Sequence, residues 1–149
     1  MIASYDTETR SRLKATTKKS LMYGNETSLE ELLVIFIDNA LKYSPPESPV
    51  EIKVREKRLH AEIQVRNQGE PIPPEQQARL FERFYRGDNS RTASDSRGYG
   101  LGLAIAKRIV DIHHGSIKVD SSRKKGTCFS ISLPTSKTTN PKLKQSPKH

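Results

Sequence analysis

The sequence predicts an α+β fold, a two-layer sandwich in which helices cover one face of a mixed, mostly antiparallel sheet. Two pairs of short segments alternate apolar and polar residues, which is typical of hairpins with one buried face. Three other segments carry apolar residues at steps of three and four, as helices with a buried stripe do. At 149 residues the chain is long enough for one domain with a real core, even though only 33% of it is hydrophobic, and has no room for a second.

The first clear helix is expected from Ser28 to about Lys42. Ser28 and Glu31 have the spacing of a capping box, in which the two residues satisfy each other's free backbone donors. Pro45 and Pro46 end the helix because proline lacks the N–H that a helix needs. The apolar residues form one stripe that faces the core: Leu29, Leu32, Leu33, Phe36, Ile37, Ala40 and Leu41.

The remaining elements are expected on both sides of a polar loop. Scattered apolar residues predict a strand around Lys14 to Met22, and Pro74 suits the first position of a short helix through Phe84. The polar stretch from 87 to 97 predicts a lid, and disorder is expected from Pro134 onward. The alternating runs that predict the hairpins are Val50, Ile52 and Val54, then Leu59, Ala61, Ile63 and Val65, and later Ser116–Ser121 and Thr127–Leu133 around a basic turn.

Composition excludes several classes of protein. The single cysteine, Cys128, excludes an internal disulfide and is expected to be structural, and no Cys/His cluster has zinc-site spacing. No apolar run approaches the roughly 20 residues that cross a bilayer, and the N-terminus lacks the apolar core of a secretory signal, so we expect a cytoplasmic fragment. The net charge of +9 lies partly in the C-terminal lysines, and no nucleic-acid recognition motif accompanies it, so no nucleic acid is expected.

The segment most informative about function runs from Gly98 to Val110, where three alternating glycines lead into an apolar helix that ends near Gly115. Glycine lets the backbone approach a polyphosphate, and the N–H groups of a helix's first turn then point at the anion. A Rossmann fingerprint is excluded because polar residues without periodicity precede the glycines, where that fingerprint needs a strand. A Walker motif is excluded because no Gly-Lys-Ser/Thr follows. A tight turn without a ligand is the alternative.

A second candidate site lies on one edge of the first helix. Ile35, Asn39, Lys42 and Tyr43 are related by steps of three and four, so they lie beside the apolar stripe. An Asn amide oxygen can coordinate Mg²⁺, a Lys can neutralise phosphate, and a Tyr ring can pack against a base. Each residue alone is also compatible with a cap, a solvated charge or the edge of the core. Together the four residues fit a metal–nucleotide complex.

These segments together resemble the ATP-binding catalytic domain of sensor histidine kinases, within the gyrase, chaperone, histidine kinase and mismatch-repair ATPase superfamily. Residues 38–45 are similar to the family's N box and residues 81–86 to its F box. Residues 98–103 are similar to the second glycine box and residues 126–129 to the last glycine turn. Order and spacing agree from about Leu21 to Leu133, so the resemblance implies a Bergerat-type ATP-binding fold there.

The resemblance also implies roles for single residues. Asn39 would hold Mg²⁺, Lys42 and Arg86 would contact phosphates, and these three would form the catalytic set. Tyr43 would pack on the adenine. Asn67 stands where the family commonly has an aspartate, and its carbonyl oxygen would still accept from the adenine amine, with softened selectivity. The other implied ATP contacts are Gly69, Ile72, Phe84, Gly98, Tyr99, Gly100, Leu101, Gly102, Leu103 and Thr127.

Ile35 is the main departure from the family. Its kinases often carry a second polar residue there, and its hydrolases carry the glutamate general base, so metal coordination or turnover is expected to weaken. Isoleucine cannot activate water, which argues against an autonomous ATPase and fits phosphoryl transfer to a nucleophile from another domain. The chain's histidines lie outside any acceptor motif, and His113 and His114 are expected to close the last helix.

The sequence therefore predicts the catalytic domain of a two-component sensor histidine kinase, which transfers the terminal phosphoryl group of ATP to a histidine of a separate dimerisation domain. A response regulator would act downstream. Residues 21–133 would be the domain, 1–20 a linker segment and 134–149 a disordered basic tail. The fragment itself is expected to make no membrane contact, even if the parent protein is anchored. A degenerate, non-catalytic ATP-binding module and an anti-sigma-factor-type serine kinase are the alternatives.

Overall fold

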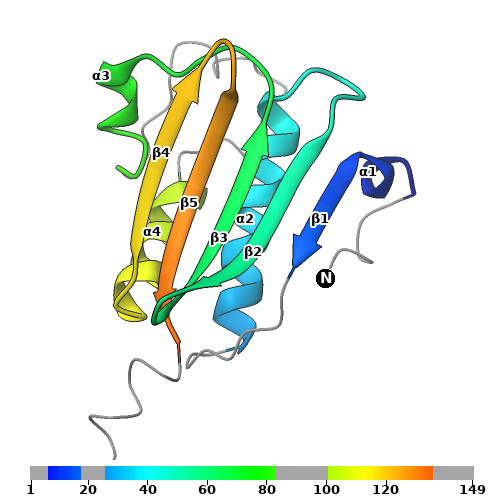
Figure 1. The fold of residues 1–149 in the computed structure, drawn as a ribbon. Helices are drawn as coiled ribbons and strands as arrows, with labels where there is room; N and C mark the ends of the chain where they lie inside the picture. The colour runs from blue at the N-terminus through cyan, green and yellow to red at the C-terminus, as the bar shows by residue number, and fades with distance from the viewer. Residues whose placement is uncertain (1–6, 18–25, 83–100, 136–149) are drawn as a thin grey trace, which may run out of the picture.

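Five strands form one mixed sheet with two long helices on one face (Figure 1). The computed structural model describes residues 7–17, 26–82 and 101–135. The strand order is β1-β2-β3-β5-β4, with β1 parallel to β2 and every other neighbouring pair antiparallel, which confirms the predicted fold class. The strands are β1 (Leu13–Thr17), β2 (Val50–Lys57), β3 (His60–Asn67), β4 (Ser116–Ser122) and β5 (Gly126–Pro134).

The core lies between this sheet and the helices α2 (Glu26–Tyr43) and α4 (Gly102–Ile112). The predicted stripe of α2 faces the sheet, and its central residues Leu32, Phe36 and Ile37 are fully buried. The Phe36 and Phe129 rings pack with their centroids 5.2 Å apart. Burying one such side chain contributes about 1.5–3 kcal/mol, so this stripe is what holds α2 on the sheet. None of the described helices is both long and apolar enough to span a membrane.

The N-terminal elements differ from the prediction. α2 begins at Glu26, so Ser28 lies inside the helix and not at its N-cap. A short helix, α1 (Thr7–Arg12), was not predicted, and the strand that follows it is β1. Of the predicted strand at 14–22, residues 14–17 are confirmed and the rest lie outside the described residues.

Three element boundaries also differ from the prediction. Helix α3 (Pro74–Gln77) starts at the expected proline but ends early, because residues 79, 80 and 82 donate to carbonyls three positions back, not four. Leu59 belongs to the exposed turn of the first hairpin and not to β3, since Arg58 has a positive φ of 58°. Order continues past Pro134, because Thr135 is buried and its N–H and hydroxyl both donate to the Leu59 carbonyl.

The predicted closure of α4 by its two histidines is confirmed. His113 is the C-cap and His114 has a left-handed φ of 61°. The N–H of His114 donates to the Asp111 carbonyl at 3.0 Å and the N–H of Gly115 to the Val110 carbonyl at 2.9 Å. This pair of bonds is the Schellman motif, which satisfies carbonyls that the helix end leaves free.

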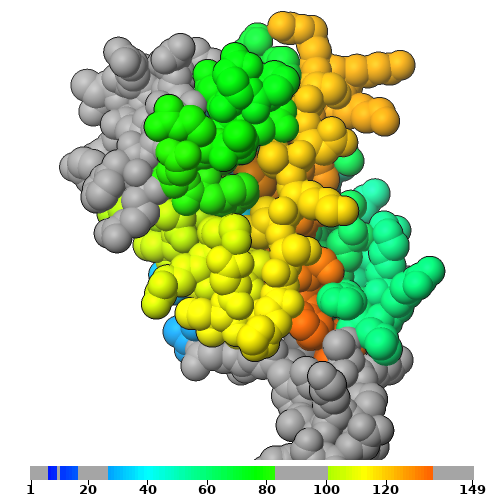
Figure 2. All heavy atoms as spheres, turned by 90° about the vertical axis from the view of Figure 1, so that its left-hand side faces the viewer, coloured from blue at the N-terminus to red at the C-terminus, as the bar shows by residue number. Residues whose placement is uncertain are grey.

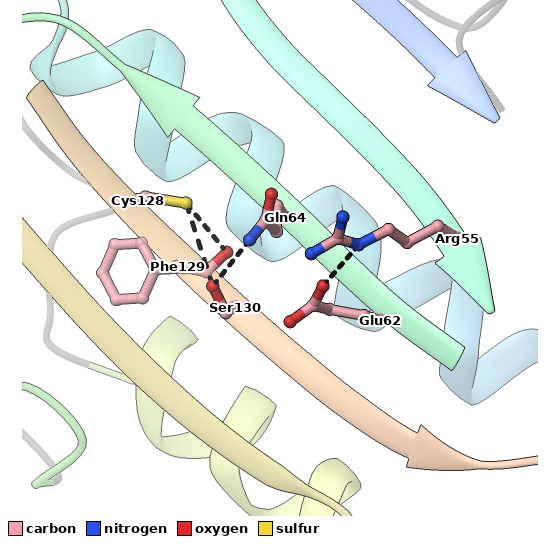
Figure 3. Close-up of polar contacts among 6 residues, drawn as sticks. All are labelled: Arg55, Glu62, Gln64, Cys128, Phe129 and Ser130. Carbon is pink, nitrogen blue, oxygen red and sulfur yellow. Dashed lines mark hydrogen bonds and ion pairs between the residues drawn. The ribbon is translucent and has the colours of Figure 1, made fainter. Parts of the chain in front are cut away.

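The opposite face of the sheet carries polar side chains (Figure 3). Arg55 of β2 and Glu62 of β3 form an ion pair of 2.8 Å, and Gln64 donates to the Ser130 hydroxyl at 3.5 Å. Cys128 lies in the same row of β5 as Ser130, with its Sγ 3.9 Å from the Ser130 Oγ. Cys128 is buried at 3% exposure, as expected for a structural residue.

Candidate functional site

Three polar side chains form a row across one end of the sheet. Asn67 of β3 pairs with Thr127 of β5, and Thr127 pairs with Ser121 of β4. The hydroxyl oxygens of Thr127 and Ser121 are 2.7 Å apart, and the N–H of Ile72 donates to the Ser121 hydroxyl at 2.8 Å. The next row belongs to the core: Val65, Phe129 and Val119. The row Asn67–Thr127–Ser121 is therefore where the apolar layer gives way to hydrogen-bonding groups.

Asn67 holds a buried acceptor. The residue is only 5% exposed, and its Nδ2 donates to the Gln68 carbonyl at 2.7 Å. Among the residues that the structure describes, none donates a hydrogen bond to the Asn67 Oδ1. A buried oxygen left without a donor costs roughly 1–3 kcal/mol, so a ligand that supplies an N–H would stabilise this site.

Two glycines bring the end of α2 against this row. Gly69 has a φ of +136°, and a Cβ there would lie 2.6 Å from the Tyr43 carbonyl oxygen. Gly126 has a φ of +79°, and a Cβ there would overlap the Asn67 carbonyl oxygen. Glycine at position 69 allows the chain after β3 to approach α2 this closely. Glycine at position 126 allows the β4–β5 turn to pack against Asn67. Tyr43 and Asn67, 24 residues apart in sequence, thus become neighbours of the same glycine.

The predicted edge of α2 leads away from this row. Tyr43 is 44% exposed, and the Lys42 Nζ lies 5.0 Å from the centre of its ring. Asn39 lies one turn earlier on the helix, and its amide has no hydrogen bond with any described residue. No group of three His, Cys, Asp or Glu side chains in the described ranges could hold a metal ion. A magnesium ion at this edge would therefore depend on the Asn39 amide oxygen and on oxygens of a ligand or water.

The amino end of α4 lies beside Ile35, at the other end of the predicted α2 edge. Gly102 opens the helix, and a Cβ there would lie 3.7 Å from the Cγ2 of Ile35. Leu101, the N-cap residue, makes no side-chain cap bond, and the first turn carries no acidic residue. Leu103 packs on the core and anchors this turn. Figure 2 shows α4 at the surface beside β4, with α3 above it. The first-turn N–H groups are therefore available to an anion.

The structure brings most of the predicted site residues into one arrangement. From Ile35 to Tyr43 the α2 edge covers eight residue steps, or about 12 Å at the rise of an α-helix. It connects the amino end of α4 with the buried acceptor of Asn67. Five predicted residues lie outside the described ranges: Phe84, Arg86, Gly98, Tyr99 and Gly100. The polar lid predicted at 87–97 also lies outside them.

One contributor was missed by the prediction. The Ser121 hydroxyl holds both the backbone of Ile72 and the side chain of Thr127. Its signal in the sequence was the alternation of β4, which places Ser121 on the same face as Ile117 and Val119. A polar residue at the end of an otherwise apolar row is the pattern to look for.

Comparisons with known proteins show the family and the fold. The family model of histidine kinase-, DNA gyrase B- and HSP90-like ATPases matches residues 24–137. The chain is 45% identical over 102 residues to the signal transduction histidine-protein kinase ArlS of Staphylococcus aureus strain USA300. The aligned residues make up 68% of this chain and 22% of that kinase.

Solved structures show the same fold. The mycobacterial sensor histidine kinase MprB matches with a TM-score of 0.75 and 33% identity, over 85% of this chain and 87% of that one. Full-length ShkA in complex with AMPPNP matches with a TM-score of 0.68 and 24% identity, over 83% of this chain and 25% of that one. The chain spans about a fifth of the curated relatives that it matches. It belongs to the family of histidine kinase-, DNA gyrase B- and HSP90-like ATPases, as a catalytic domain of the histidine kinase type.

Proposed function

We propose that this domain binds ATP with Mg²⁺ and presents the terminal phosphate to a histidine on a separate dimerisation and phosphoacceptor domain. The observation that carries the proposal is the buried Asn67 Oδ1, which accepts no hydrogen bond from the described residues. The amino group of adenine is a donor of matching chemistry. Guanine carries an oxygen at the equivalent position and would repel this acceptor.

The Asn67 amide is held in one orientation. An asparagine that could rotate its amide would offer an N–H to guanine as readily as an oxygen to adenine. Here the Nδ2 is engaged with the Gln68 carbonyl at 2.7 Å, which keeps the Oδ1 as the free acceptor. We therefore infer selectivity for adenine, although an asparagine replaces the aspartate common in the family.

The remaining residues would position the nucleotide along the α2 edge. Tyr43 would offer its exposed ring to the base, and the first turn of α4 would donate N–H groups to the phosphates. Lys42 would neutralise phosphate charge, and Arg86 is predicted to do the same. The Asn39 amide oxygen would hold Mg²⁺, which supplies charge neutralisation at the phosphates when bound. Ile35 offers no base for water, so the site favours transfer to an external nucleophile.

Isothermal titration with the non-hydrolysable analogue AMPPNP tests nucleotide binding. We expect Mg²⁺-dependent binding, and we expect Asn67→Leu, which is similar in size but has no acceptor, to weaken it by about tenfold or more. Gln64→Leu is the matched control, because Gln64 lies on the opposite face of the sheet. No binding by the unmodified chain, or equal losses in the two variants, would contradict the proposal.

A phosphotransfer assay tests the acceptor. The chain is mixed with the dimerisation and phosphoacceptor domain of a related sensor histidine kinase, radiolabelled ATP and Mg²⁺. A label on that domain that is lost in acid and kept in base would identify phosphohistidine and leave a response regulator as the next acceptor. An acid-stable label would identify a serine kinase. Nucleotide binding without any transfer would identify a non-catalytic module.

A further inference from the structure

One arginine ties the first described helix to the end of α2. Arg12, the last residue of α1, is half-buried and reaches the loop that joins α2 to β2. Its Nη2 donates to the Ser44 hydroxyl at 2.6 Å and to the Pro45 carbonyl at 3.2 Å. Its Nε donates to the Ser48 carbonyl at 3.0 Å. Three acceptors on a five-residue stretch make this contact a fork-shaped clamp, a geometry that guanidinium suits.

The clamped loop is a stiff continuation of α2. Ser44 donates its N–H to the Ala40 carbonyl at 3.1 Å and its hydroxyl to the Leu41 carbonyl at 3.2 Å, so it continues the hydrogen bonding of the last turn. The Ser48 N–H and hydroxyl both donate to the Pro45 carbonyl. Prolines at 45, 46 and 49 restrict the backbone further. The Arg12 charge also lies at the carboxyl end of α2, where the helix dipole is negative.

Apolar packing of α2 on the core ends at Leu41, before the last two residues of the helix. The last fully buried residue of α2 is Ala40, whereas Lys42 and Tyr43 are exposed. We propose that Arg12 is a positioning residue for nucleotide binding, because it fixes the turn of α2 that carries Tyr43 and Lys42. This inference rests on the proposed function, since the two residues matter as nucleotide contacts. Freeing a helix end costs little global stability but lowers local order.

The test compares Arg12→Ala with Arg55→Ala. Arg55 also makes a polar contact of 2.8 Å, with Glu62, but on the open face of the sheet. We expect Arg12→Ala to weaken AMPPNP·Mg²⁺ binding by about tenfold and to speed amide exchange at residues 43, 44, 47 and 48 by a similar factor without nucleotide. Arg55→Ala should change neither. Arg12→Lys keeps the charge without the fork and should bind with an affinity between those of the native chain and Arg12→Ala.

The outcomes separate this inference from the proposed function. Nucleotide binding that is unchanged in Arg12→Ala, with faster amide exchange, overturns the positioning role and leaves the nucleotide site intact. No binding by the unmodified chain overturns both. If Arg12→Ala does not fold, Ser44→Ala removes one partner of the clamp and is expected to weaken binding by about threefold. Unchanged binding in Ser44→Ala and Arg12→Lys then overturns the positioning role.

Discussion

At the residue scale, two glycines of the site are expected to respond differently to the same methyl group. Gly69 has a φ of +136°, and a Cβ there would lie 2.6 Å from a backbone oxygen. At Gly102 the nearest described atom that a Cβ would meet is the Ile35 Cγ2 at 3.7 Å, an ordinary contact. We expect Gly69→Ala to lower the free energy of unfolding by about 2 kcal/mol and Gly102→Ala to change it by less than about 0.5 kcal/mol, as measured by urea denaturation.

The same pair separates folding from binding. Gly102→Ala should fold normally yet weaken AMPPNP binding, because a Cβ would stand beside the N–H groups of the first turn of α4. Equal stability of the two variants would show that the close approach at Gly69 does not constrain the fold. Unchanged nucleotide affinity in Gly102→Ala would count against the amino end of α4 as the phosphate site.

At the element scale, Ile35 joins the two helices of the site. Its side chain is half-buried, packs on the core and faces the amino end of α4. Replacing it with the polar residue common in the family, Ile35→Asn, exchanges apolar packing for an amide. We expect a loss of about 1–2 kcal/mol in the free energy of unfolding, whereas Ile35→Val should lose about 0.5–1 kcal/mol.

Nucleotide titrations on these variants, with and without Mg²⁺, test whether Ile35 weakens Mg²⁺-dependent nucleotide binding. If the native site lacks a useful ligand, Ile35→Asn should bind AMPPNP more tightly with Mg²⁺ and equally well without it. A large gain in phosphotransfer by this variant would mark the natural site as weakened. No gain in affinity or transfer would mean that Asn39 suffices and that Ile35 serves packing between α2 and α4.

At the scale of the whole molecule, a bound nucleotide would join the sheet, α2 and α4. Binding to the folded state alone stabilises it by about 2.7 kcal/mol at a ligand concentration of 100 Kd. For a chain of this size we expect AMPPNP with Mg²⁺ to raise Tm by roughly 5–10 °C, measured by scanning calorimetry. Chelating Mg²⁺ with EDTA should remove most of this shift. An equal shift with the guanine analogue GMPPNP would contradict the role assigned to Asn67.

Much of the fold could be predicted because hydrophobic periodicity is local. The stripe of α2 and the alternation of both hairpins identified the core faces from short windows of sequence. Boundaries were less predictable, as the capping box at Ser28 shows, because the helix begins two residues earlier at Glu26. Leu59 was misplaced because its apolar side chain continued an alternation that the turn at Arg58 interrupts.

The sequence by itself determined the elements, their buried faces and the motifs that resemble the family, since each depends on residues close together in the chain. Only the tertiary structure decided which side chains meet. Asn67, Thr127 and Ser121 form one row because of the order and register of three strands. Arg12 reaches Ser44 and Ser48 across 32 and 36 residues because β1 pairs in parallel with β2. Such contacts depend on the paths of loops and on strand register, which no local pattern encodes.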